Sequence, residues 1–97
     1  MAAYLIVNFQ IDDPDAYKAY QKGAVPSLKI GDESKLVAYD TDTTHLEGDQ
    51  AGTQTVVLEF ESKERAQEIY DSGDYQAVLP ARMGATSKHF GILANGV

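Results

Sequence analysis

The stretch Val56–Arg82, VVLEFESKERAQEIYDSGDYQAVLPAR, decides the fold of this chain. It predicts a strand, a helix, a second short helical piece and an arginine. Side chains alternate between the two faces of a strand, so Val56, Leu58 and Phe60 should share one apolar face. We expect this strand to run over 53–60 and to lie at the centre of the molecule, with the rest of the chain packed around it.

Capping residues set the expected ends of the two helical pieces. Ser62 is a suitable N-cap, because its hydroxyl can accept a hydrogen bond from a free first-turn N–H. Gly73 is expected to end the first helix in a left-handed conformation, and Asp74 to cap the second piece. Pro80 has no N–H to donate, so we expect the second piece to be short or kinked there.

Outside this stretch the sequence predicts further strands and one further helix. A first strand at Ala3–Ile11 has one wholly apolar face, and Asp13-Pro14 is typical of a helix start. That helix carries an inward stripe, which is expected to be core: Ala16, Tyr17, Tyr20 and Ala24. A second strand is predicted at Lys35–Asp40, a possible short strand at Thr44–Glu47, a connection over 84–87 and a last strand at Lys88–Ala94. The order predicts one α+β domain over residues 1–97, a ferredoxin-like βαββαβ sandwich with an antiparallel sheet and the helices on one face.

The sheet face away from the helices is expected to be half apolar. It would carry Tyr4, Ile6, Asn8, Val57 and Glu59, a set too apolar to be left in water. We therefore expect a homodimer in which two such sheets pack face to face.

Composition narrows the classes of partner. The 97 residues carry a formal net charge of −7 and no cysteine. The charge disfavours binding to nucleic acid and to anionic membranes, and the missing thiols exclude disulfides and thiolate chemistry. The N-terminal residues show neither a signal peptide nor a membrane span, so we expect a cytoplasmic protein.

Four segments carry a resemblance to a known family: DPDAY at 13–17, LEGD at 46–49, VLEF-x-S at 57–62 and YDSGDYQAVLPAR at 70–82. Together they resemble a family catalogued as a domain of unknown function in the dimeric α+β barrel superfamily. The resemblance implies a ferredoxin-like subunit whose sheet packs against that of a partner. Relatives in that superfamily include cofactor-independent monooxygenases, muconolactone isomerase-like enzymes, haem-dependent chlorite dismutases and ligand-binding regulatory domains, so the fold leaves the function open.

Two residues are candidates for proton transfer. Glu59 facing an interior cavity could have a raised pKa and shuttle protons, and His89 is a second candidate. Asn8 could orient a substrate carbonyl, with Tyr4 beside it on the same face. The alternative is that Asn8 and Glu59 only form hydrogen bonds across the sheet or the dimer seam.

Arg82 and Tyr75 are candidates for ligand binding. Arg82 could bind a carboxylate or an enolate, or form a buried ion pair, for example with Glu59. We expect Arg82 to line a cavity that Glu59 also reaches. Tyr75 could contact the ligand or simply pack with a satisfied hydroxyl.

Two functions remain in competition. The first is a dimer that binds or transforms a small anionic or aromatic organic molecule. The second is a non-enzymatic structural or regulatory dimerisation module. We expect no metal and no cofactor, because His45 and His89 are isolated and have no ligand spacing.

Overall fold

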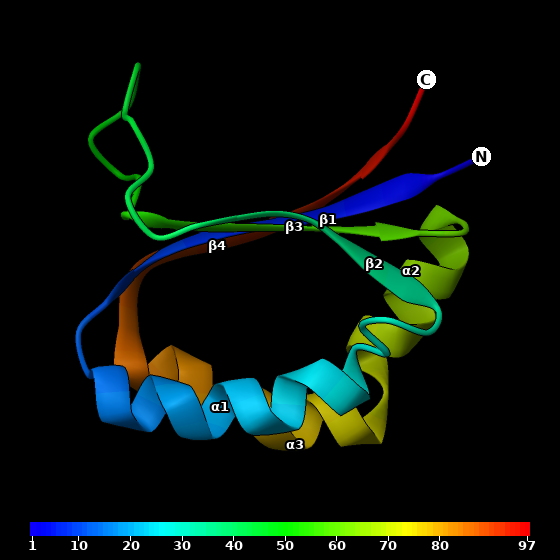
Figure 1. The fold of residues 1–97 in the computed structure, drawn as a ribbon, viewed down its shortest axis with the longest axis horizontal. Coiled ribbons are helices and arrows are strands. Elements are labelled where there is room, and N and C mark those ends of the chain that lie inside the picture. Colours follow the sequence, from blue (N-terminus) through cyan, green and yellow to red (C-terminus); the bar gives the residue numbers. More distant parts are fainter.

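All three helices lie on one face of a four-stranded antiparallel sheet (Figure 1). The computed structural model describes residues 1–97. Its elements are β1 (Ala3–Ile11), α1 (Pro14–Ser27), β2 (Ser34–Asp40), β3 (Gln54–Phe60), α2 (Lys63–Asp71), α3 (Gly73–Ala85) and β4 (Thr86–Asn95). The strand order is β2-β3-β1-β4. The predicted ferredoxin-like βαββαβ arrangement is confirmed, with the second helical region divided into α2 and α3.

Strand alternation places the core as predicted. On β1 the odd-numbered residues Leu5, Val7 and Phe9 are buried under the helices, and Leu58 and Phe60 of β3 join them. In the register of β1 and β3, Leu5 pairs with Leu58 and Ile6 with Val57. Ile6 and Val57 therefore share the other face, which no element of this chain covers (Figure 1). We call this the open face.

Capping explains where α1 and α2 begin. The Asp13 carboxylate accepts a hydrogen bond from the Ala16 N–H at 3.2 Å, and Pro14 follows as the first helical residue. The Ser62 hydroxyl accepts from the Arg65 N–H at 3.1 Å. Each cap satisfies a backbone donor that has no partner inside its helix, and both predicted helix starts are confirmed.

The boundary between α2 and α3 differs from the prediction. Ser72, in an extended conformation, follows the last residue of α2 and is also the N-cap of α3, where its hydroxyl accepts from the Tyr75 N–H at 3.3 Å. Gly73 is therefore the first residue of α3 rather than a left-handed terminator, and Asp74 is not the cap. Helix α3 continues for 13 residues through Pro80, so it is not the short piece that was expected. The proline removes only one backbone hydrogen bond, and the buried Tyr75 and Ala85 hold the two ends of the helix in place.

The predicted connection over 84–87 and the short strand at Thr44–Glu47 are both wrong. Strand β4 starts directly after α3, and its pairing with β1 contains an irregularity between Asn8 and Gln10. Lys88 adopts a positive φ of 53° there, the local distortion that an extra residue in a strand produces. Residues 41–53 form an irregular loop that rises at one end of the sheet, on the side of the open face (Figure 1). We call it the β2–β3 loop.

Gly23 permits the close contact of the two long helices. A Cβ at this position would lie 2.5 Å from Cγ1 of Val78, so only glycine allows α1 and α3 to approach so closely. The two helices run side by side beneath the sheet (Figure 1). No helix of the structure has the length and apolar character needed to span a membrane.

Gly52 gives a direct test of how the β2–β3 loop is attached. A side chain at Gly52 would overlap the backbone of Phe9, so Gly52→Ala should lower the free energy of unfolding by about 1–3 kcal/mol. Gly73→Ala is the matched control, since nothing lies within 4 Å of the added carbon, and it should leave stability unchanged or raise it by up to about 1 kcal/mol. Urea denaturation measures both, and equal stability of the two variants would contradict the packing described here.

Candidate functional site

The structure separates the predicted site residues onto two faces of the sheet. Tyr4, Asn8 and Glu59 belong to the open face, as the pairing of Tyr4 with Glu59 and of Asn8 with Thr55 shows. Tyr75 and Arg82 are buried on the helix side. The expected meeting of Arg82 and Glu59 in one cavity is therefore wrong, because the sheet itself lies between them.

The polar groups of the open face are occupied by one another. The Tyr4 hydroxyl donates to Oε1 of Glu59 at 3.2 Å, and this hydrogen bond raises the pKa of Tyr4. The Asn8 amide donates to the Gly52 carbonyl at 3.1 Å and to the Thr55 hydroxyl at 2.9 Å, and Asn8 accepts from the Gly52 N–H at 2.7 Å. Asn8 thus fixes the β2–β3 loop to the sheet. This geometry agrees with the alternative in which Asn8 only forms hydrogen bonds within the structure.

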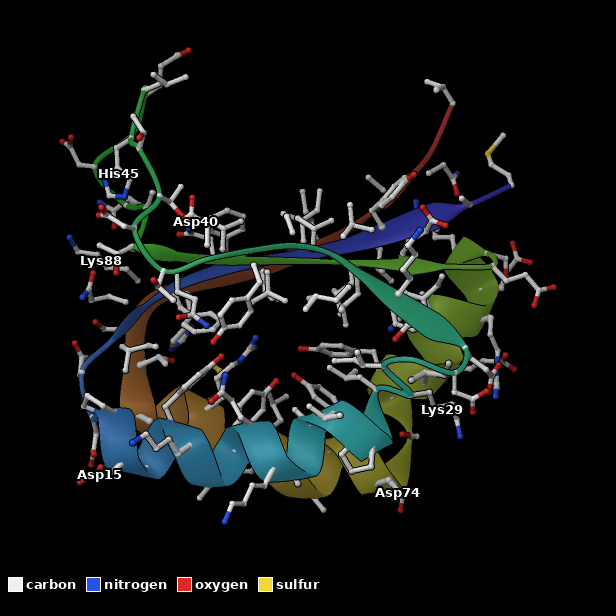
Figure 2. The ribbon with its side chains drawn as sticks, viewed as in Figure 1. Asp15, Lys29, Asp40, His45, Asp74 and Lys88 are labelled. Atoms are coloured by element: carbon white, nitrogen blue, oxygen red, sulfur yellow. The ribbon has the colours of Figure 1, made fainter.

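The two histidines do not lie together: His45 binds the same Gly52 carbonyl as Asn8, whereas His89 lies in β4. His45 donates through Nε2 to the Gly52 carbonyl at 2.9 Å and so helps to hold the β2–β3 loop, on which Figure 2 shows it above the sheet. His89 is half-buried in β4, beside the distortion at Lys88, and makes no side-chain hydrogen bond within the chain. No three His, Asp or Glu side chains are grouped so that they could hold a metal ion.

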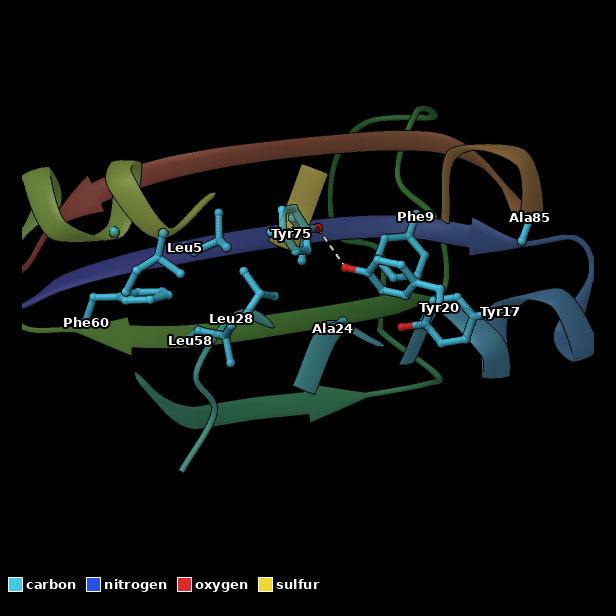
Figure 3. Packing of buried hydrophobic residues seen from close by; sticks show 13 residues of the cluster. Leu5, Phe9, Tyr17, Tyr20, Ala24, Leu28, Leu58, Phe60, Tyr75 and Ala85 are labelled. Carbon is cyan, nitrogen blue, oxygen red and sulfur yellow. Dashed lines mark hydrogen bonds between the residues drawn. The ribbon is translucent and has the colours of Figure 1, made fainter. Parts of the chain in front are cut away.

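A layer of aromatic rings separates the helices from the sheet, and Arg82 lies within it. The ring centroids of Phe9 and Tyr17 are 5.4 Å apart, and those of Tyr17 and Tyr20 are 5.6 Å apart. The hydroxyls of Tyr20 and Tyr75 share a 2.7 Å hydrogen bond that joins α1 to α3 (Figure 3). These rings come from β1, α1 and α3, so three elements build the site.

Arg82 is a buried cation without an acidic partner. The residue is 4% exposed, and none of the three ion pairs in the chain includes it. Its guanidinium carbon lies 5.4 Å from the Phe9 ring centroid and 5.9 Å from that of Tyr20. Nη2 contacts the sulfur of Met83 at 3.9 Å, and Nε is buried with no acceptor. Ring contacts offset only part of the cost of burying a charge.

A cavity of about 130 Å³ lies between α1 and the sheet, next to this cluster. Its lining is hydrophobic and aromatic except for Gln21, and it includes Phe9, Tyr17, Tyr20 and Tyr75. At its outer side three lining residues are about half exposed: Val25, Leu36 and Tyr39. We call these three residues the mouth. The Gln21 amide donates to the Tyr39 hydroxyl at 2.8 Å and links α1 to β2 there.

Comparison of the sequence with family models identifies the family of this chain. The model described as Domain of unknown function (DUF1330) matches residues 2–96. The chain belongs to this family. The resemblance seen in the sequence is therefore confirmed. No curated protein matches the sequence.

Solved structures share the fold at low sequence identity. A protein of unknown function from Rhodopseudomonas palustris has a TM-score of 0.79 and 16% identity, over 99% of this chain and 82% of the other. A dimeric ferredoxin-like protein of unknown function from Thermobifida fusca has a TM-score of 0.63 and 16% identity, over 98% and 92%. A proposed antibiotic biosynthesis monooxygenase from Caulobacter crescentus has a TM-score of 0.62 and 12% identity, over 99% and 90%. At these identities the likeness shows the fold alone.

Burial controls the ionisation of the tyrosines in this DUF1330 chain. Burial raises the pKa of Tyr17 and Tyr20 far above the ordinary value, and it also raises the pKa of Tyr75. The positive charge of Arg82 opposes the rise in all three pKa values. The three phenols therefore stay protonated at neutral pH and can donate hydrogen bonds.

Sequence reasoning missed Gln54 as part of the site. This glutamine is 1% exposed, and its amide donates to the Tyr17 hydroxyl at 3.0 Å. A signal was present, because Gln54 shares the inward face of β3 with Val56 and Leu58, and a buried amide requires a polar partner. Tyr17 and Tyr20 are core residues as predicted, and they also line the cavity.

The raised tyrosine pKa values predict a loss of stability in alkali. Unfolded tyrosines ionise near pH 10, whereas folded Tyr17, Tyr20 and Tyr75 retain their protons beyond that pH. Their contribution to stability is complete below about pH 10 and is lost as pH rises further. Denaturant unfolding should show this decline, and phenolate absorbance should show these tyrosines ionising together with unfolding. Tyr20→Phe should make the decline shallower, and complete tyrosine ionisation in a still folded protein would contradict the prediction.

Proposed function

We propose that this protein binds a small, largely apolar organic molecule in the cavity beneath α1. The observation that supports the proposal is a cavity of about 130 Å³ with a hydrophobic and aromatic lining. An engineered apolar cavity of about 150 Å³ in another protein binds benzene, so a single ring or a short alkyl chain suits this volume. The half-exposed mouth between α1 and the edge strand β2 offers an entry route.

Binding is better supported than proton-transfer catalysis. Neither Glu59 nor His89 is among the residues that line the cavity, and Glu59 lies on the opposite face of the sheet. The lining contains no carboxylate and no imidazole, and the raised pKa values of Tyr17, Tyr20 and Tyr75 keep these three hydroxyls protonated at neutral pH, so that they cannot act as bases there. A role for Glu59 or His89 in chemistry would therefore require a site other than this cavity.

The cavity proposal predicts stabilisation by small neutral aromatic compounds such as benzyl alcohol. A ligand that binds only the folded state raises the melting temperature by mass action. Ala24 is buried and lines the cavity, so Ala24→Leu should fill it and remove the shift. Ala19→Leu makes the same change on the exposed side of α1 and should preserve the shift. Thermal unfolding with increasing compound measures both, and equal shifts in the two variants would place the ligand elsewhere.

A second copy of the chain is the best occupant for the open face. Phe90 and Ile92 of β4 are about half exposed there, and Ile6 pairs with Ile92 and with Val57 across the sheet. The result is an apolar band over three strands, of the kind that marks a protein interface. The Thermobifida fusca neighbour is described as dimeric, which supports a dimer for this chain.

The alternative function also requires this dimer. If the protein is a structural or regulatory dimerisation module, the open face is its working surface and the cavity has no ligand. The two functions share the dimer and differ in whether the cavity binds a ligand, so the thermal-shift experiment separates them.

The homodimer predicts a mass of twice the chain in light scattering at micromolar concentration. Ile6→Lys places a charge in the centre of the open face and should yield monomers, because an unpaired charge in an apolar interface is costly. Val25→Lys is the control, since Val25 is half exposed on the helix side and its change should leave the dimer intact. A monomeric wild-type protein would refute the proposed interface.

A further inference from the structure

Arg82 and three tyrosine hydroxyls form a cluster beside the cavity: those of Tyr17, Tyr20 and Tyr75. This cluster has more hydrogen-bond donors than the chain can satisfy. Nε of Arg82 is buried and has no acceptor. The Tyr20 and Tyr75 hydroxyls share one hydrogen bond, which uses only one of their two hydrogens. The Tyr17 hydroxyl accepts from Gln54, and its own hydrogen has no acceptor within the chain. Buried donors without acceptors are rare in folded proteins, because each leaves a desolvation cost uncompensated.

The cluster also carries a positive charge that no acidic residue balances. The chain has 15 acidic residues against 8 lysines and arginines, yet Arg82 forms no ion pair. The acids near the two long helices lie on the outside: Asp15 and Asp74 project away from the layer between helices and sheet (Figure 2). Glu59 is on the open face. The cluster therefore presents a positive charge and donor hydrogens, with no carboxylate to meet them.

We propose that this cluster receives the anionic group of a small organic acid whose apolar part occupies the cavity. Phe9 and Tyr20 lie at the boundary of the two regions, since both line the cavity, which Arg82 itself does not, and both lie against the guanidinium. The anionic group would therefore reach Arg82 past these two rings. The ligand is an apolar carboxylate, enolate or phenolate with a single negative charge, matching the single guanidinium. This inference rests on the binding function proposed above and adds the chemical class of the ligand.

Two roles for Arg82 predict opposite effects of its removal. A structural arginine would destabilise the protein when replaced, because its partners would lose their contacts. An arginine reserved for a ligand is a cost to the empty protein, so an apolar side chain of similar length should be tolerated or favoured. Arg82→Met should therefore fold with an unchanged or higher melting temperature and fail to discriminate anions.

The test compares benzoate with benzamide, a neutral molecule of nearly the same shape, by titration calorimetry at neutral pH. Wild-type protein should bind benzoate about tenfold or more tightly than benzamide, as expected for a charge-assisted hydrogen bond in a buried site. Arg82→Met should lose this preference and still bind benzamide. Arg65→Met is the control, since Arg65 is paired with Glu33 at the surface, and it should retain the preference.

Each contrary outcome points to a different step. Equal affinity for the two compounds in the wild type, or a preference that persists in Arg82→Met, would overturn the assignment of an anion to Arg82 and leave the cavity function standing. Failure of every aromatic compound to bind would overturn the cavity function as well.

A second measurement keeps the inference testable if Arg82→Met does not fold. The wild-type protein should bind 4-nitrophenol as the phenolate, so the bound compound should show phenolate absorbance at a pH where the free compound is largely protonated. Bound 4-nitrophenol that stays protonated would contradict the inference.

Discussion

The 2.7 Å hydrogen bond between Tyr20 and Tyr75 is the contact on which the helix layer depends. It joins α1 to α3 at the height of the aromatic rings, while Gly23 allows the same two helices to touch through Val78. Together these contacts make the helices one unit, held off the sheet by the thickness of the rings. The cavity lies in this layer, between α1 and the sheet.

Arg82 places a buried positive charge in this layer. An apolar side chain at this position would complete the core without an unsatisfied donor, whereas the guanidinium leaves Nε without an acceptor. Proteins keep buried polar groups of this kind mainly where function uses them. The open face shows the opposite condition, since Tyr4, Asn8 and Glu59 satisfy one another or hold the β2–β3 loop. The contrast favours the helix side as the place where a ligand binds.

The sequence was sufficient for the fold but only partly for the site. Strand alternation and the caps at Asp13 and Ser62 predicted the sheet faces and the helix starts. The extent of α3 could not be predicted. Ser72 caps the end of α2 as well as the start of α3, and α3 accommodates Pro80 in its interior, and both features depend on packing against α1. Arg82 was identified, but its neighbours were not, because a helical piece expected to be short or kinked at Pro80 does not fix where in the helix layer Arg82 lies. Gln54 was missed because its partner Tyr17 lies far away in the sequence.

The most direct test of the central claim is the NMR signal of the Arg82 Nε–H, assigned by its loss in Arg82→Met, during titration with benzoate. We predict a saturable shift of this signal, with the affinity found by calorimetry and with no comparable shift of the Arg65 Nε–H. Benzamide should shift the Arg82 signal far less than benzoate. An Arg82 signal that stays in place while benzoate saturates the protein would contradict an anion site at Arg82.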